Sequence, residues 1–310
     1  MQKNLLPAIF LSWVGSLWAF SPQGEALADR ILLSTLSTQY EQALRQADTL
    51  VLEDSAVGGF FQAMIRISRY DDLGDTLDLD SSKEILEGHV WSEPFWESLR
   101  RFQLGYIQTV TGHTLSAALT TRKAAQGFAK ISLLDAQGFY AIYEYYLEDV
   151  TSWIPFQTDR RPELLKVLDS AARQSRWFGS LFSTSLVWML FDRKDFVEAL
   201  TIVDALLLRY PEHPVFLQMR ADMLFRLRRY PEAAALYLQS AENYSKRAPG
   251  SVRWWSAAGN LVRIYYAMGD SSAMRLWQKP FGEARFTRIR PWMPQSLLES
   301  LEKANMIPSE

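Results

Sequence analysis

The chain has 310 residues, of which 48% are apolar, and its formal net charge is −2. With 33 basic and 35 acidic residues there is no overall positive field, so we expect no binding to nucleic acid. The absence of cysteine excludes disulfides, thiol nucleophiles and cysteine-ligated zinc sites.

The N-terminal segment has the layout of a secretory signal. Lys3 precedes the apolar run Leu5–Phe20, and a small-x-small sequence ends at Ala28. The run is shorter than the roughly 20 residues of a transmembrane helix. We therefore expect residues 1–28 to be a signal peptide cleaved after Ala28, with an uncleaved anchor as the alternative. Residues 29–310 are then expected to be a soluble, non-membrane-spanning domain in the periplasm or outside the cell.

Two helices are predicted ahead of an acidic stretch. Residues 30–52 place an aromatic residue, two alanines and a leucine on one face, which predicts a single amphipathic helix. A helix at about 56–69 begins with Gly58-Gly59, which we interpret as a site of close packing because no lysine or strand accompanies it. Residues 70–82 contain five aspartates whose order does not fit a calcium-binding EF-hand, so we expect a solvated loop.

Proline, glycine and capping residues divide the rest of the chain into helices. Ser92-Glu93-Pro94, for example, combines a capping serine with a proline suited to the first helical turn. The expected helices are at about 82–91, 94–111, 114–130, 135–150, 162–174, 177–191, 195–209, 214–228, 230–246, 252–268, 270–278 and 295–303.

A repeat of 34 residues organises the centre of the chain. Phe196 and Ala199 recur as Tyr230 and Ala233 at this spacing, which is the signature of stacked helical hairpins. With Ser180 as the first position of a repeat, further small and apolar residues fall where the tetratricopeptide repeat has them, and a proline falls near the end of the repeat. The chain therefore resembles an exported bacterial tetratricopeptide protein, most clearly over residues 180–245.

The resemblance implies an all-α fold. We expect a right-handed α-solenoid of about six tetratricopeptide-like hairpins, preceded by one N-terminal helix and closed by a C-terminal capping helix. Such an array grows by repetition around one continuous core, so residues 29–310 would form one domain.

The resemblance also implies a partner-binding groove lined by the first helix of each hairpin. Carried over position by position, the groove residues are Phe102, Tyr106, Thr184, Trp188, Gln218, Asp222, Arg226, Arg263 and Tyr266. Aromatic residues at one end and two arginines at the other would suit a peptide or an acidic tail. The alternative is that the aromatic residues are core and the arginines are solvated.

No motif for catalysis stands out. The three histidines are far apart, and neither a metalloprotease, a nucleophile-elbow nor a phosphate-loop sequence is present. We expect no enzyme activity, no catalytic residues, no metal site and no cofactor. The favoured function is a non-catalytic scaffold in the periplasm or envelope that binds a protein or peptide partner. The alternative is a glycan- or cell-wall-binding module, for which a row of exposed tryptophan and tyrosine side chains would be expected.

Overall fold

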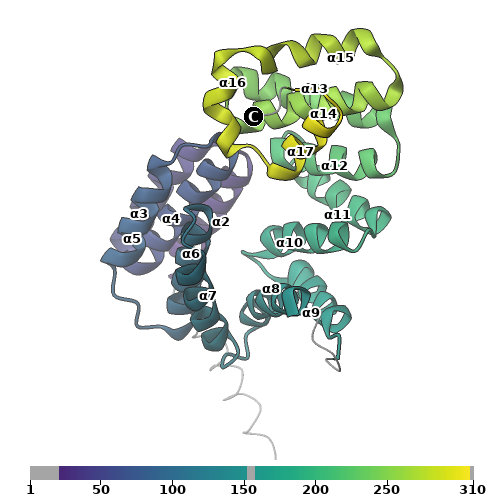
Figure 1. The fold of residues 1–310 in the computed structure, drawn as a ribbon. Helices are drawn as coiled ribbons and strands as arrows, with labels where there is room; N and C mark the ends of the chain where they lie inside the picture. The colour runs from purple at the N-terminus through teal and green to yellow at the C-terminus, as the bar shows by residue number, and fades with distance from the viewer. Residues whose placement is uncertain (1–20, 152–157, 308–310) are drawn as a thin grey trace, which may run out of the picture.

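The computed structural model describes residues 21–151 and 158–307, and it is all-helical over these residues (Figure 1). It contains sixteen α-helices there. They are α2 (Pro22–Leu36), α3 (Tyr40–Glu53), α4 (Ser55–Leu73), α5 (Leu77–Gly88), α6 (Pro94–Val110), α7 (Thr114–Phe128), α8 (Leu134–Thr151), α9 (Arg161–Gln174), α10 (Gly179–Asp192), α11 (Phe196–Arg209), α12 (Pro214–Arg226), α13 (Tyr230–Arg247), α14 (Val252–Met268), α15 (Ser271–Gln278), α16 (Ala284–Ile289) and α17 (Gln295–Lys303). Two 3₁₀ turns, η1 (Lys279–Gly282) and η2 (Arg290–Trp292), flank α16.

From α2 to α15 each helix packs against the next one along the chain, as expected for a helical solenoid. Glycines allow the closest approaches. A Cβ atom at Gly105 of α6 would lie 2.2 Å from Thr121 of α7, and one at Gly58 of α4 would lie 2.3 Å from Val51 of α3. The interpretation of Gly58-Gly59 as a packing site is therefore confirmed.

Five of the inter-helix turns share one backbone geometry. In each, a single residue has positive φ, and the next N–H donates to a carbonyl five residues before it, which is the Schellman arrangement. The five residues are Thr38, Gly112, Lys194, Arg228 and Gly269. Only two are glycine, although the left-handed conformation costs other residues about 1 kcal/mol. The hairpins therefore repeat in backbone conformation more regularly than in sequence.

The prediction of one helix over residues 30–52 is wrong. The chain forms α2 and α3 there, separated at Ser37-Thr38-Gln39 by the turn at Thr38. No proline or glycine marks this break. Helix α2 also begins before the predicted cleavage site, with Ser21 as its cap, and Leu27 and Ala28 are buried. The apolar run at residues 5–20 lies outside the described residues, and the signal peptide remains a prediction.

The prediction of a solvated loop over residues 70–82 is also wrong. Helix α4 extends to Leu73 and α5 begins at Leu77. Asp72 and Asp78 are each only 1% exposed. Each carboxylate pairs with an arginine. Asp78 pairs with Arg69 at 2.6 Å, and Asp72 pairs with Arg247, which is far along the chain. Local composition suggested solvation, whereas tertiary partners make burial possible.

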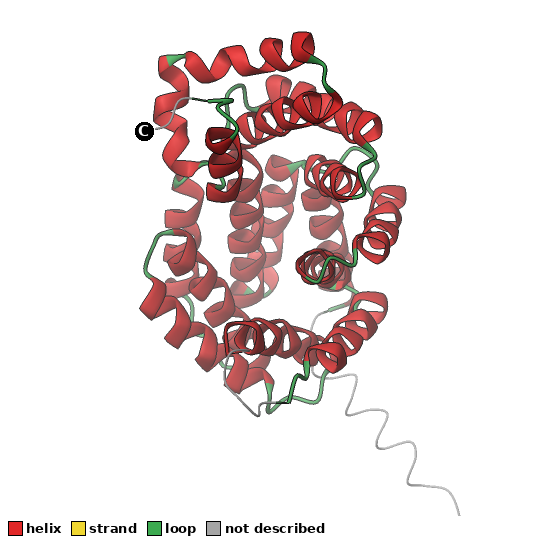
Figure 2. Cartoon of the chain, turned by 45° about the vertical axis from the view of Figure 1, so that its right-hand side comes forward, coloured by secondary structure: helices red, strands yellow, loops and turns green. Residues whose placement is uncertain are grey.

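The chain of helices curves until its two ends meet, and Figure 2 shows the resulting ring. Helix α4 lies beside α13 and α14, and hydrogen bonds from Tyr244, Arg247 and Arg253 to Asp71 and Asp72 join them. Phe178, just before α10, contacts Phe60 of α4, Phe95 of α6 and Phe139 of α8, with ring centroids 5.1–6.4 Å apart. One apolar cluster runs from α2 to α14, so the core is continuous along the array.

A separate apolar cluster closes the C-terminal end. Trp255 of α14 contacts Phe281 and Phe286 at 5.2 and 5.3 Å between ring centroids. Leu297 and Leu301 of α17 are buried in the same cluster. The predicted capping helix is confirmed. Across the described residues, no helix combines the length and apolar character that crossing a membrane requires.

Candidate functional site

Two arginines of the expected groove lie over aromatic rings. The Cζ atom of Arg226 in α12 is 5.0 Å from the ring centre of Phe191 in α10, and that of Arg263 in α14 is 4.9 Å from Phe225 in α12. Trp188 contacts Phe191 edge to face at 5.7 Å. We refer to these five residues as the arginine–aromatic cluster. Phe191 and Phe225 are 34 residues apart, so the cluster follows the repeat.

No carboxylate lies within ion-pair distance of either guanidinium among the described residues. Arg263 donates a hydrogen bond to a side chain of its own helix, the Oδ1 of Asn260, at 3.1 Å. Burial lowers the pKa of Arg263, and the nearby charge of Arg226 lowers it further. Two close cations held by rings keep N–H donors available for an external anion.

Asp222 of α12 is the acid of this region. Tyr237 of α13 donates its hydroxyl to the Asp222 carboxylate. Burial raises the pKa of Asp222 to about 6, although the hydrogen bond from Tyr237 and the charges of Arg263 and Arg226 lower it. Gln218, one helical turn earlier, has a buried Oε1 with no hydrogen-bond partner among the described residues. The region therefore combines two cations, one internally bonded acid and an available acceptor.

The other expected groove residues are dispersed. Phe102 packs in the core against Phe128 and Phe139, at 6.3 and 5.3 Å between ring centroids. Thr184 donates to the carbonyl of Ser180 in its own helix at 2.8 Å. Tyr266 is 59% exposed at the end of α14. Tyr106 donates its hydroxyl to Asp71 of α4. Four of the nine residues, Trp188, Asp222, Arg226 and Arg263, thus come together, and Gln218 lies one helical turn from Asp222 in α12.

A buried polar junction joins the two ends of the ring, and no local sequence feature marks it. The Asp72 carboxylate accepts hydrogen bonds from Tyr40 of α3 at 2.9 Å, and from Tyr244 and Arg247 of α13 at 2.8 and 2.5 Å. Burial raises the pKa of Tyr40 and Tyr244, and the Asp72 charge raises it further. Arg253 of α14 donates to the Asp71 carbonyl at 2.5 Å. We call these contacts the Asp72 junction.

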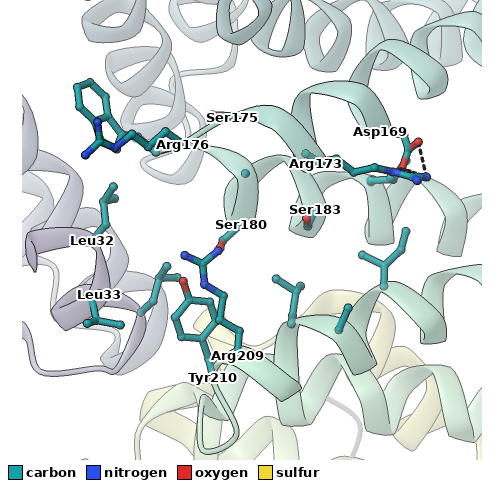
Figure 3. Close-up of a pocket in the computed structure, with 18 of the residues that line it drawn as sticks. Leu32, Leu33, Asp169, Arg173, Ser175, Arg176, Ser180, Ser183, Arg209 and Tyr210 are labelled. Atoms are coloured by element: carbon teal, nitrogen blue, oxygen red, sulfur yellow. Dashed lines mark hydrogen bonds and ion pairs between the residues drawn. The ribbon is translucent and has the colours of Figure 1, made fainter. Parts of the chain in front are cut away.

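A cavity of about 820 Å³ lies between α2 and the helices α9, α10 and α11. Figure 3 shows Leu32 and Leu33 of α2 on one side and Ser180, Ser183 and Arg209 opposite. None of the nine expected groove residues lines it. We call it the α2 cavity. Sequence reasoning missed it because α2 was not expected to be a separate helix facing later repeats.

The arrangement defines an all-α protein of consecutively packed helices, compatible with a helical repeat protein. A comparison with models of protein families finds no match, and a comparison with curated proteins finds none either. Among the residues that the structure describes, no group of three or more histidine, aspartate or glutamate side chains is arranged to hold a metal ion.

Proposed function

We propose that this protein is an exported, non-catalytic scaffold of the tetratricopeptide kind, which binds an acidic segment of a polypeptide partner at the arginine–aromatic cluster. The observation that carries the proposal is that Arg226 and Arg263 stack on Phe191 and Phe225 instead of pairing with carboxylates. A guanidinium fixed by a ring loses less conformational entropy on binding than a mobile one.

Charge supports an anionic ligand. Two guanidinium groups surround one acid, Asp222, whose hydrogen bond to Tyr237 is internal. Arg253 adds a third positive charge that acts on Asp222. An incoming carboxylate would find N–H donors on two guanidiniums, and charge-assisted hydrogen bonds of this type are about twice as strong as neutral ones.

The tryptophans favour this function over glycan binding. Where the structure describes their side chains, none of the tryptophans is among the exposed large apolar residues, and Trp96, Trp177 and Trp255 are buried. Sugar-stacking platforms need exposed rings in a row. A mixed surface of aromatic rings and arginine is the pattern expected for peptide binding.

The test uses Trp188 as an internal reporter, because its ring contacts Phe191 beneath Arg226. The purified chain is titrated with an unlabelled peptide of ten glutamates, with a ten-residue Gly-Ser peptide and with soluble cell-wall glycans. We expect a saturable change in tryptophan fluorescence with the acidic peptide alone, abolished by Arg226→Glu with Arg263→Glu. The same pair should lose its cross-linked partners in an envelope extract.

The matched control is Arg45→Glu with Arg275→Glu, which makes the same charge change at two exposed arginines elsewhere. It should bind like the parent protein, and the melting temperatures of all three proteins should agree. Equal binding by both double variants would show that the arginine–aromatic cluster is not part of the binding site. A response to glycans without one to the acidic peptide would support the glycan alternative.

A further inference from the structure

The α2 cavity contains one arginine that the chain leaves without a counter-ion. Arg173 pairs with Asp169 at 2.7 Å, and Arg176 pairs with Asp29 at 2.6 Å. Arg209 is exposed and makes no ion pair with any described residue. Its Cζ atom lies 5.4 Å from the ring centre of Tyr210. Figure 3 shows its guanidinium extending into the cavity beside Ser180. The cavity therefore offers an anion a fixed cation at one end.

The opposite wall, on α2, is apolar except for Asp29, which is paired with Arg176. Leu32, Leu33 and Leu36 of α2 line it, and Leu33 is 56% exposed. Ile202 and Ala205 of α11 face them from the other side. Leu32 and Leu36 are half-buried beside Leu33, and apolar side chains that border a cavity favour an apolar ligand surface. A ligand that uses both walls would present apolar groups to α2 and a carboxylate to Arg209.

The size of the cavity selects among such ligands. Its lining on α2 runs from Asp29 to Leu36, which is about 10 Å at 1.5 Å per helical residue. Its volume of about 820 Å³ is close to that of a two-turn helix about 10 Å long and about 10 Å across with its side chains. A single acyl chain would leave most of this volume without contacts.

We propose that the α2 cavity binds an amphipathic α-helical segment, about two turns long, of a polypeptide partner. The apolar face of the segment packs on Leu32, Leu33 and Leu36, and an aspartate or glutamate at one end pairs with Arg209. The site is separate from the arginine–aromatic cluster, since no residue of that cluster lines the cavity. It also lies entirely after the predicted cleavage site at Ala28.

The experiment is a selection from a displayed library of 12-residue, lactam-constrained helical peptides against the full chain. We expect enriched peptides with leucine or isoleucine at i, i+3, i+4 and i+7, followed by an acidic residue. Arg209→Glu should weaken their binding about tenfold or more, and replacing the acidic residue of the peptide by lysine should restore it. Ala205→Trp, at an exposed wall position, should fill the cavity and abolish binding.

Arg275→Glu serves as the charge-matched control and should bind like the parent protein, and circular dichroism should give the same melting temperature for every variant. The proposal is wrong if the enriched peptides bind Ala205→Trp and Arg209→Glu as tightly as the parent. It is equally wrong if no helical pattern is enriched while dodecanoate binds and is lost in Ala205→Trp, because the occupant would then be an acyl chain.

Discussion

The N-terminal helices meet the later helices at the Asp72 junction, at the α2 cavity and where Phe178 packs on Phe60 and Phe95, and the first two of these contacts are built differently. At the Asp72 junction, a carboxylate that is 1% exposed accepts hydrogen bonds from three donors on α3 and α13. At the α2 cavity, Arg176 pairs with Glu25 and Asp29 through side chains that are 36–54% exposed, and Trp177 donates to Asp29. The first contact is buried, whereas the ion pairs of the second are exposed and border a cavity.

The difference assigns the two contacts different roles. Removing one partner of a buried charge leaves the others unpaired, whereas exposed ion pairs contribute little. Helical repeats ordinarily contact only their neighbours, so stability is a sum of local terms. The Asp72 junction adds a contact between residues 172 and 175 positions apart, and it couples the ends of the array. We therefore expect the α2 side, with its exposed ion pairs, to be the more adaptable of the two.

The largest expected effect is that of Asp72→Ala. Arg247, Tyr40 and Tyr244 would lose their common acceptor while remaining buried or partly buried, so we expect a loss of about 3–5 kcal/mol in unfolding free energy. Urea unfolding measures the loss, and small-angle scattering should show an increased radius of gyration as the ring opens.

A second buried aspartate provides the matched control. Asp78 is also 1% exposed, but its partner Arg69 lies in the adjacent helix α4. Asp78→Ala should lower stability without enlarging the radius of gyration. If the two variants expand equally, or neither expands, the Asp72 junction does not close the ring.

The sequence predicted helices well wherever the 34-residue pattern or a proline marked them. Helix α14 was expected at 252–268 and is observed there, and α17 likewise at 295–303. Residues 30–52 were predicted to form one helix because the break between α2 and α3 lies at Thr38, in a left-handed turn that glycine usually marks. A backbone conformation that the local residue type disfavours cannot be predicted from composition.

The candidate site was predicted only in part, for a similar reason. Asp222, Arg226 and Arg263 come from repeat positions that the helical period aligns, so their meeting follows from the pattern. Asp72 and Tyr244 meet because the whole array curves into a ring, which depends on the sum of many helix-packing angles. The spacing of the repeats alone does not determine the sum of these packing angles.

The next largest effect concerns acid stability at the Asp72 junction. Burial lowers the pKa of His213 to about 4, the charge of Asp72 raises it, and that of Arg247 lowers it further. A depressed histidine pKa means that stability is fully present above the ordinary value of 6.5 and is lost as pH falls toward 4. The shift corresponds to about 3 kcal/mol at most.

His213→Phe should remove this loss. The substitution keeps a ring stacked on Phe216, whose centroid is 4.0 Å away, but cannot be protonated. Unfolding free energies of both proteins are measured between pH 7 and pH 4. We expect the unfolding free energy of the variant to rise relative to that of the parent as pH falls. Parallel curves would show that His213 titrates normally.

The smallest expected effect is at the α2 side. Arg176→Gln removes the ion pairs to Glu25 and Asp29, which are exposed enough that global stability should fall by less than about 1 kcal/mol. Trp177 still donates to Asp29 at 3.0 Å, so α2 should remain docked but open more often. Hydrogen exchange measures this directly: amides of α2 should exchange faster, while those of α13 should be unchanged. A large global loss, or unchanged exchange in α2, would mean that this contact is not the more adaptable of the two, and the contrast between the junctions would not hold.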